Sequence, residues 1–522
     1  MALGKSISVS FILRNLAMTT MDTLKKYFPT GTTEGDRQLL DRIFITPEQL
    51  PDVLAAPTGS PRLLVGNKGV GKTAILEWLF AAAKRRKIPA IFLRPDDLDL
   101  SPIAKTTDVS SIKRGMYECF LDAVATAIGQ KLSGLLHGSA AELYNESVSR
   151  GARKEDWMSK LLTLLSRLSK PITQIDAKQL ASDLAKQTLS RDQLAEVITR
   201  YLLSEKSLFL ILVDDTDQVA TLDDPQHLNR IWGLLLAVRK LTSTSPNIKC
   251  VVTLRTEVWM RLTRNERGQR DQVDHFRPLV MFLRAQEELI KSILKNRISL
   301  AANEDGYKGS RPELHFFDDE WMTLPMSNER RSWDQFLLKS SRERPRDMIQ
   351  LVNHLATAAK TRRSIKIGAK DAEIAMEGYS KERAEDLAIE MGFDCSAFLE
   401  VIRSFVDLDF ESSFEQVREH LRGVPSRFSL QVGGRSLKPG NDDDALVILS
   451  LLHESGFLNA RVPDNRQPNK YRHIGFLDDP HLVQNSRWND LQAARWEVHP
   501  AFRTYLIALQ KERSWRSGKT II

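Results

Sequence analysis

The sequence predicts an α/β fold, in which a parallel sheet is followed by a helical region and a smaller C-terminal domain. Three apolar runs carry this prediction, at 63–65, 208–213 and 248–254. Each run suits a buried strand, and segments with helical periodicity separate the runs. Because strands that alternate with helices form parallel sheets, the polar residues that follow these runs are expected to meet at one sheet edge.

The composition indicates a multidomain protein. The chain has 522 residues, of which 42% are hydrophobic, and this length allows about two to four domains. No apolar run reaches the roughly 18 residues of a membrane-spanning helix. The apolar stretch at 6–13 is short and lacks a secretory cleavage site. We therefore expect a cytoplasmic protein with no membrane partner.

Cysteine content and charge restrict the classes of partner. Cys119, Cys250 and Cys395 are widely spaced, which predicts reduced thiols and no disulfide framework or metal site. The net charge is +8 and the pI is about 9.2. This charge permits contact with nucleic acid without requiring it.

The chain is expected to begin with a flexible extension over 1–34, and Met18 or Met21 is an alternative start. Residues 30–60 lead into the sheet, and four prolines break this stretch into short pieces: Pro47, Pro51, Pro57 and Pro61. The nucleotide-binding core is predicted to begin at residue 35.

A phosphate-binding loop follows the first apolar run. Its spacing is G-x-x-x-x-G-K-[ST], and its residues are Gly66, Asn67, Lys68, Gly69, Val70, Gly71, Lys72 and Thr73. The apolar run before it and the helix-forming run at 74–80 give the strand–loop–helix context that this motif requires. The loop N–H groups and the helix N-terminus attract phosphates. Lys72 would reach the β and γ phosphates, and the Thr73 hydroxyl would hold Mg²⁺. The alternative is a chance match in a glycine-rich turn.

The run at 208–213 ends abruptly in carboxylates, Asp214-Asp215-Thr216-Asp217. Asp214 would hold the hydration shell of Mg²⁺, and Asp215 would orient the attacking water, since phosphoryl transfer depends mostly on positioning and charge. Asp217 is interpreted as a helix-capping or loop residue. The alternative is a strand that leaves the core into a solvated acidic loop.

The run at 248–254 ends in Arg255. Because the carboxyl ends of parallel strands share one edge, Arg255 is placed to interact with a γ-phosphate. The alternative is a surface arginine that pairs with Glu257.

Taken together, the loop, the Asp214-Asp215 strand end and the Thr253-x-Arg255 strand end resemble the AAA+ and STAND branch of P-loop NTPases. Residues 344–349, Arg-Pro-Arg-Asp-Met-Ile, resemble the second sensor of this branch. The resemblance implies ATP and Mg²⁺ as cofactors and implies that Arg346, on a helical lid, contacts the nucleotide.

The sequence also resembles a poorly characterised bacterial P-loop ATPase family, which shares the loop, the strand end at 93–97, the acidic run and the 344–349 helix start. The resemblance covers about residues 35–360. The family implies a setting in antiviral defence or mobile elements. The residue after the Mg²⁺ aspartate is Asp215 where AAA+ proteins carry glutamate, which resembles the STAND side and implies slow turnover.

Arginines are frequent after the third strand. This run includes Arg255, Arg261, Arg264, Arg267, Arg270, Arg277 and Arg284. Three interpretations stay open. The arginines form a solvated face, supply an arginine finger to a neighbouring subunit, or bind DNA or RNA phosphates.

The remaining organisation follows from periodicity. The core over 35–280 contains a second strand at 90–93, a helical insertion over 110–205 and a helix at 226–243. A helical lid over 281–384 and a C-terminal domain over 385–522 follow it.

In this C-terminal domain, helices at 411–421 and 443–452 precede a hairpin of strands at 457–462 and 471–474, which suggests a winged helix. A winged helix at this position would serve either as a lid or protein-interaction module, or as a DNA-binding module. The hairpin supplies the basic residues for the second role, Arg461, Arg466, Lys470 and Arg472. His499 resembles a nucleotide-contacting histidine of STAND proteins, and a structural histidine is the alternative.

Two functions are therefore expected. The first is an ATP-hydrolysing switch that acts as a homo-oligomer in a bacterial defence or regulatory complex, with a separate effector chain. The second is a DNA- or RNA-binding ATPase of loader or transposition-helper type. A nucleotide-binding scaffold with little hydrolysis is a third possibility.

Overall fold

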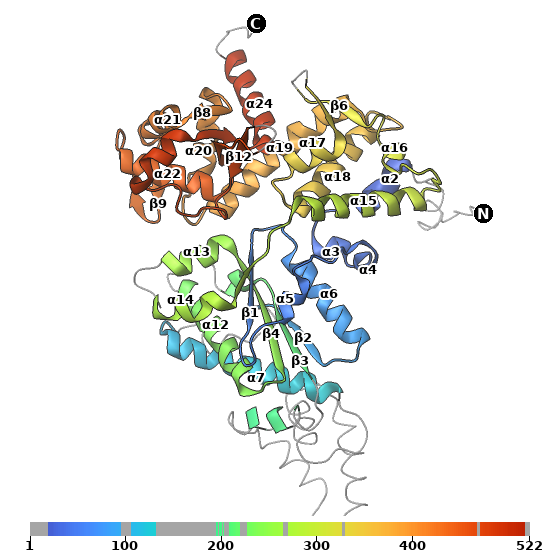
Figure 1. Ribbon diagram of the computed structural model, residues 1–522, viewed down its shortest axis with the longest axis vertical. Coiled ribbons are helices and arrows are strands. Elements are labelled where there is room, and N and C mark those ends of the chain that lie inside the picture. Colours follow the sequence, from blue (N-terminus) through green and yellow to red (C-terminus); the bar gives the residue numbers. More distant parts are fainter. Residues whose placement is uncertain are drawn as a thin grey trace, which may run out of the picture. The chain divides into compact units, whose positions relative to one another are not determined.

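The computed structural model describes residues 19–95, 106–131, 195–196, 198–200, 202, 208–219, 227–264, 270–325, 329–466 and 470–516. The chain forms two compact units (Figure 1). The sheet unit is Thr46–Arg284, and the helical unit joins Met1–Ile45 to Ala285–Ile522. The core therefore begins at residue 46, where the sequence predicted residue 35.

A single parallel sheet forms the centre of the sheet unit. Its five strands lie in the order β2-β3-β4-β1-β5, and every neighbouring pair is parallel. Their bounds are β1 Arg62–Gly66, β2 Ala90–Leu93, β3 Phe209–Val213, β4 Ile248–Arg255 and β5 Val280–Phe282. The predicted α/β fold is confirmed. The exception is β5, a short edge strand in a stretch that was expected to begin the helical lid.

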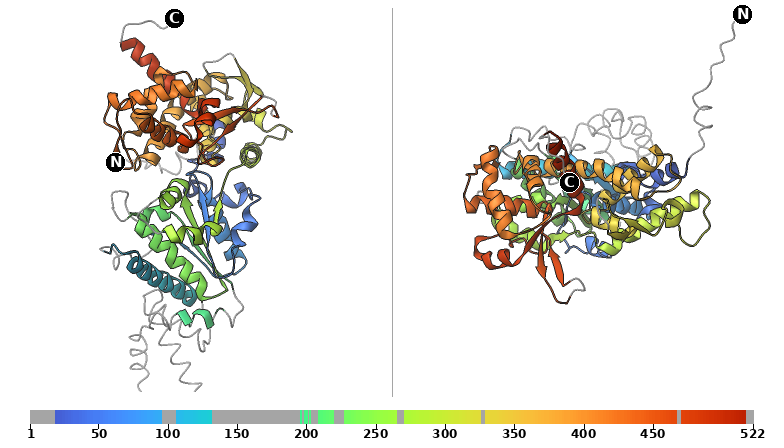
Figure 2. Two further views of the ribbon diagram at one scale, coloured as in Figure 1. Left: turned by 60° about the vertical axis from the view of Figure 1, so that its left-hand side comes forward. Right: turned by 90° about the horizontal axis from the view of Figure 1, so that it is seen from above.

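Helices cover both faces of the sheet (Figure 2, left). They are α5 Leu50–Leu54, α6 Lys72–Arg85, α7 Val109–Lys131, α12 His227–Thr244, α13 Thr256–Arg264 and α14 Arg270–Phe276. Leu63 and Val65 on β1 share one buried cluster with α7 and α12. The two helices approach closely at Gly233, where a Cβ would lie 2.3 Å from Ile112 Cγ2. Helix α7 matches the start of the predicted insertion, and residues 132–194 of that insertion lie outside the described residues.

The first part of the helical unit is a bundle that includes the N-terminal segment. Its helices are α2 Thr20–Tyr27, α3 Thr33–Asp36, α4 Leu40–Ile43, α15 Glu287–Glu304, α16 Glu313–Phe316, α17 Trp333–Ser340, α18 Pro345–Thr361 and α19 Ala369–Met391. A hairpin joins β6 Trp321–Thr323 to β7 Arg330–Ser332. Helix α2 packs against α15 and α18 with Met21, Leu24 and Tyr27 buried. Residues 19–27, predicted as part of a flexible extension, are therefore a packed helix with its N-cap.

The second part of the helical unit combines helices with a sheet. The helices are α20 Phe398–Ser404, α21 Phe414–Arg427, α22 Asp442–Glu454, α23 Trp488–Ala493 and α24 Pro500–Arg516. The strands β8 Glu411–Ser413, β11 Leu458–Pro463, β12 Tyr471–Ile474 and β13 Arg495–Val498 form an antiparallel sheet in the order β12-β11-β13-β8. A second hairpin pairs β9 Gln431–Val432 with β10 Arg435–Ser436.

The predicted helices and hairpin of this part are present. However, residues 411–413, expected to begin a helix, form β8. Helix α21 begins after Ser413, whose side chain forms a capping box with Gln416. Among the residues that the structure describes, no helix is long and apolar enough to cross a membrane.

Candidate functional site

The phosphate loop lies between the end of β1 and the start of α6. Gly66 closes the strand in a crowded position, because a Cβ there would lie 2.9 Å from Val70 Cγ1 and 3.0 Å from the Leu283 carbonyl oxygen. Gly71 precedes the helix with φ 106°, which side chains rarely tolerate. These two glycines let the chain turn sharply between β1 and α6. The first N–H groups of α6 can then face a phosphate bound beyond the end of β1.

Lys72 folds back over its own loop. Its Nζ donates to the carbonyl oxygens of Gly66 at 2.6 Å and Asn67 at 3.1 Å. Burial lowers the pKa of Lys72 to about 8, although the nearby Glu257 carboxylate opposes this shift. A bound phosphate would compete with these two carbonyls for the ammonium group, as the role predicted for Lys72 requires.

Asp214 is the buried carboxylate of the site. The side chain is 1% exposed, and the Thr253 hydroxyl donates to Oδ1 at 2.6 Å. Thr216 in turn donates to the Thr253 carbonyl at 2.7 Å, which ties the end of β3 to β4. The second oxygen, Oδ2, is buried and receives no hydrogen bond from the described residues.

This unsatisfied oxygen fits a cation. Magnesium is held by one or two carboxylates together with waters and phosphate oxygens. Asp214 and Thr73, a half-buried residue in the first turn of α6, are the side chains that could hold Mg²⁺ here. They are the pair that the sequence predicts.

Asp215 follows in a strained conformation, with φ 50°. Burial first, and then the carboxylates of Asp214 and Asp217, raise the pKa of Asp215 to about 6. Arg94, directly after β2, forms an ion pair with it, with 3.6 Å between Nε and Oδ2. A carboxyl that loses its proton near neutrality is suited to accept one from a water.

Arg255 extends from the end of β4, between β1 and β3. Its Nε lies 3.0 Å from Asp217 Oδ2, and its Nη1 lies 4.0 Å from Glu257 Oε1. Both predicted alternatives describe part of this geometry, because Arg255 lies at the correct edge and also pairs with Glu257. Asp217 lies in a short 3-10 helix, Thr216–Val219, and its pairing with Arg255 was not predicted.

The strand order explains which residues meet. Because β4 lies between β1 and β3, the carboxyl ends of these strands bring together the phosphate loop, Asp214, Asp215 and Arg255. Arg94 comes from the neighbouring β2 and was missed. Its position directly after an apolar run was the signal that could have identified it.

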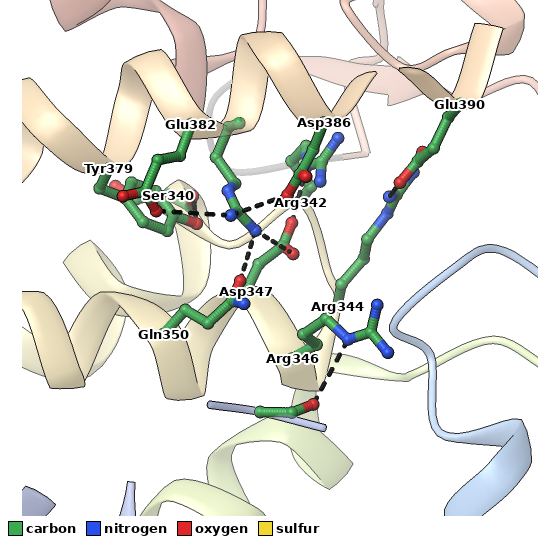
Figure 3. Close-up of polar contacts among 12 residues, drawn as sticks. Ser340, Arg342, Arg344, Arg346, Asp347, Gln350, Tyr379, Glu382, Asp386 and Glu390 are labelled. Atoms are coloured by element: carbon green, nitrogen blue, oxygen red, sulfur yellow. Dashed lines mark hydrogen bonds and ion pairs between the residues drawn. The ribbon is translucent and has the colours of Figure 1, made fainter. Parts of the chain in front are cut away.

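Other predicted residues lie elsewhere. Arg346 belongs to the helical unit, at the start of α18, and its Nε donates to the Gly31 carbonyl at 3.3 Å (Figure 3). Its nucleotide contact stays a prediction. His499 is held by Ala501, whose N–H donates to Nδ1 at 3.2 Å. Burial, reinforced by Arg342 and Arg503, lowers the pKa of His499 to about 3, as expected for a structural histidine. Of the arginine run, Arg267 lies outside the described residues.

Comparison with known proteins gives one family match. Residues 288–388 match the family described as the FunZ-associated C-terminal helical domain. A search of curated proteins finds no match.

Several solved structures match most of the length of this chain, with low TM-scores. Cdc6p from Pyrobaculum aerophilum is 14% identical, with 94% of this chain and 98% of that chain covered and a TM-score of 0.31. The Aeropyrum pernix ORC1 protein, solved in complex with DNA, is 15% identical, with 96% and 98% covered and a TM-score of 0.32. AMPPCP-bound DnaA from Aquifex aeolicus is 10% identical, with 94% and 93% covered and a TM-score of 0.26.

Proposed function

We propose that this protein is a Mg²⁺-dependent ATPase that works as a slow molecular switch. The observation that supports this function best is the buried, unsatisfied Oδ2 of Asp214, at the same sheet edge as the phosphate loop. A buried carboxylate oxygen without a donor is costly unless a cation satisfies it. ATP with Mg²⁺ supplies that cation and also the phosphates for the loop.

Each residue then has a defined task. The loop N–H groups and Lys72 bind the β and γ phosphates, while Thr73 and Asp214 hold the metal. The metal neutralises charge on the phosphate oxygens when it is bound. Asp215, ionised above about pH 6, accepts a hydrogen bond from the attacking water and orients it. Arg255 stabilises charge on the γ-phosphate.

We infer slow turnover because three charged residues of the site already have partners within the protein. Lys72 is bound to two carbonyls, Asp215 to Arg94, and Arg255 to Asp217. ATP must displace or rearrange these partners before the site can react. We infer that basal hydrolysis is weak and that assembly activates it, through one arginine of Arg261, Arg264, Arg267 or Arg270 that acts on the nucleotide of a neighbouring subunit.

The proposal also assigns roles to the helical unit. Arg346 is proposed to sense the nucleotide. The part of the chain from residue 385 is proposed to be a winged-helix-like module that engages a separate effector protein in a defence or regulatory complex. The antiparallel strands β11 and β12, which follow α21 and α22, support this module.

The test is nucleotide binding by calorimetry. Lys72→Ala should weaken ATP affinity by at least about tenfold, or about 1.4 kcal/mol. Asp214→Asn should remove the Mg²⁺ dependence of binding. Lys84→Ala is the matched control, because it removes a cation from the same helix, where Lys84 lies over the Phe80 ring. Unchanged ATP affinity in a folded Lys72→Ala protein would rule the function out.

Nucleic-acid binding is the second candidate, and the hairpin of β11 and β12 favours it. Arg466 is 86% exposed and Arg472 is 56% exposed. Both pair with Asp464, and Arg461 pairs with Glu411 and lies over the Tyr471 ring, so part of this charge is already compensated. A fall in affinity for duplex DNA with rising salt, lost in Arg466→Ala/Arg472→Ala, would support this candidate.

A further inference from the structure

One face of α18 holds the N-terminal segment by its backbone. Arg346, Gln350 and Asn353 follow each other along that face, at spacings of four and three residues. Arg346 Nε donates to the Gly31 carbonyl at 3.3 Å, and Gln350 Nε2 donates to the Thr30 carbonyl at 3.0 Å. Asn353 Nδ2 donates to the carbonyls of Phe28 at 2.5 Å and Pro29 at 3.0 Å. Residues 28–31, here named the strap, therefore lie against the helix that begins with the proposed sensor.

Gly31 makes the tightest contact between the strap and Arg346. Its φ is 68°, and a Cβ at this position would lie 2.8 Å from the Arg346 carbonyl oxygen and 3.3 Å from its Cα. Real Cβ atoms do not approach a backbone oxygen so closely, so only glycine fits. The contact uses the Nε–H of Arg346, which fixes the direction of the guanidinium group and leaves its terminal nitrogens for another acceptor.

A network of buried ion pairs fixes the orientation of the Gln350 side chain (Figure 3). Arg383, 3% exposed, donates through Nη1 to Gln350 Oε1 and to Asp347 Oδ1. Arg342 Nε donates to the other oxygen of Asp347 at 2.7 Å. Because the amide oxygen of Gln350 faces Arg383, its NH₂ group must face the strap. The orientation of this one amide thus connects the strap to the buried network.

Both ends of the strap are anchored separately. Before it, the Tyr27 carbonyl accepts from Arg297 Nη1 at 2.6 Å, and after it Asp36 pairs with the same guanidinium group. Further away, Asp22 on α2 pairs with Lys360 at the far end of α18 at 2.5 Å. The strap is therefore held at a fixed register along α18.

We propose that the strap positions Arg346 for nucleotide sensing and that Gly31 and Gln350 are positioning residues for this arginine. This inference rests on the proposed function of Arg346. The Gly31 carbonyl holds Nε, so the two terminal nitrogens of Arg346 are presented together to an anionic ligand. Gln350 keeps the strap in register, and Arg383 keeps Gln350 in the donating orientation.

A double-mutant cycle on the ATPase rate tests the proposal. Gln350→Glu keeps the size and the acceptor for Arg383 but removes the donor to Thr30, and it should lower kcat about fivefold or more. Gly31→Ala should have the same effect. In an Arg346→Ala background, Gln350→Glu should cause no further loss, because the strap acts through that arginine. Losses that multiply in the double variant would overturn the proposal. His354→Ala is the control, since it breaks a contact of α18 with Glu382 on α19, 3.0 Å from His354 Nε2, that does not involve the strap, and it should leave kcat unchanged.

A nucleotide-free measurement separates failure of this inference from failure of the proposed function. Amide hydrogen exchange over residues 20–32 should be faster in Gln350→Glu than in the unaltered protein, and unaffected by Lys72→Ala. Equal exchange in Gln350→Glu and the unaltered protein would show that the amide does not hold the strap, whether or not the protein hydrolyses ATP. If the unaltered protein hydrolyses no ATP, the proposed function fails and the sensing role of the strap fails with it.

Discussion

Asp215 is the residue on which the proposed chemistry depends most. Its left-handed backbone is one that asparagine tolerates as well as aspartate, so Asp215→Asn should preserve the fold. The amide accepts no proton and orients water poorly, and we predict a loss of about 10² in kcat with ATP affinity retained. Single-turnover hydrolysis beside calorimetric binding measures both. If Asp217→Asn abolished turnover and Asp215→Asn did not, the catalytic carboxylate would be Asp217.

The raised pKa of Asp215 also predicts how stability depends on pH. Its folded pKa of about 6 lies above its ordinary value of 3.8, so the folded state keeps this proton up to a higher pH than the unfolded state. Between these two values stability falls as pH rises, and the ionised carboxylate is destabilising above about pH 6. Asp215→Asn should therefore raise the Tm at pH 8 and leave it unchanged at pH 3. An equal Tm shift at both pH values would show that ionisation is not the cause.

Arg94 gives a second prediction at this scale. Its positive charge lowers the pKa of Asp215 against the larger effect of burial. Arg94→Gln removes that charge, so the pH at which kcat reaches half of its alkaline plateau should move upward. A pH–rate profile of both proteins measures the shift. A profile that does not move would mean that Arg94 does not act on the catalytic group, and one that moves downward would contradict the direction given by its charge.

At the scale of elements, Gly233 controls how closely α7 and α12 approach. A Cβ there would overlap Ile112 at 2.3 Å, so Gly233→Val should destabilise the sheet unit by about 1–3 kcal/mol. Gly423 on α21 is the contrasting position, because a Cβ there meets nothing within 4 Å. Gly423→Ala should stabilise its helix by roughly 0.5–1 kcal/mol. Thermal unfolding of the two variants should shift in opposite directions, and a neutral Gly233→Val would contradict the close contact.

The strands of the site were predictable because their signals are local. Apolar runs that end in Gly66, Asp214 and Arg255 place those residues at strand ends, and a parallel sheet gathers such ends at one edge. The ion pair of Arg255 with Asp217 was not predictable, since it depends on β4 lying between β1 and β3. That order is a property of the whole sheet.

Among the elements that were missed, β5 and α2 were missed for different reasons. Strand β5 has three residues at a sheet edge, too few to show a period. Helix α2 had a usable signal in Thr19 and Asp22, which form a capping box. The prediction of a flexible segment was wrong over 19–27 because the partners that stabilise α2, on α15 and α18, lie far away in the sequence.

At the scale of the whole molecule, the arginine of a neighbouring subunit is the main prediction. Specific ATPase activity should rise with protein concentration. A mixture of Lys72→Ala and Arg261→Ala subunits should recover part of the activity, because the intact phosphate loop of one meets the intact arginine of the other, if Arg261 is the acting residue. Rates measured beside sizing chromatography decide this. Turnover that is independent of concentration, from a monomer, would leave the arginines as a solvated or nucleic-acid-facing surface.

The division of the chain has a consequence for synthesis on the ribosome. The sheet unit is inserted into the helical unit, so α2 leaves the ribosome long before the helices that cover it. Arg297, which binds the Tyr27 carbonyl, follows it by 270 residues. At elongation rates of about 5–20 residues per second, the apolar face of α2 stays without these partners for roughly 14–54 s. The nascent protein therefore exposes Met21 and Leu24 throughout that interval, and a chaperone that binds short apolar helices has its longest opportunity at this end of the chain.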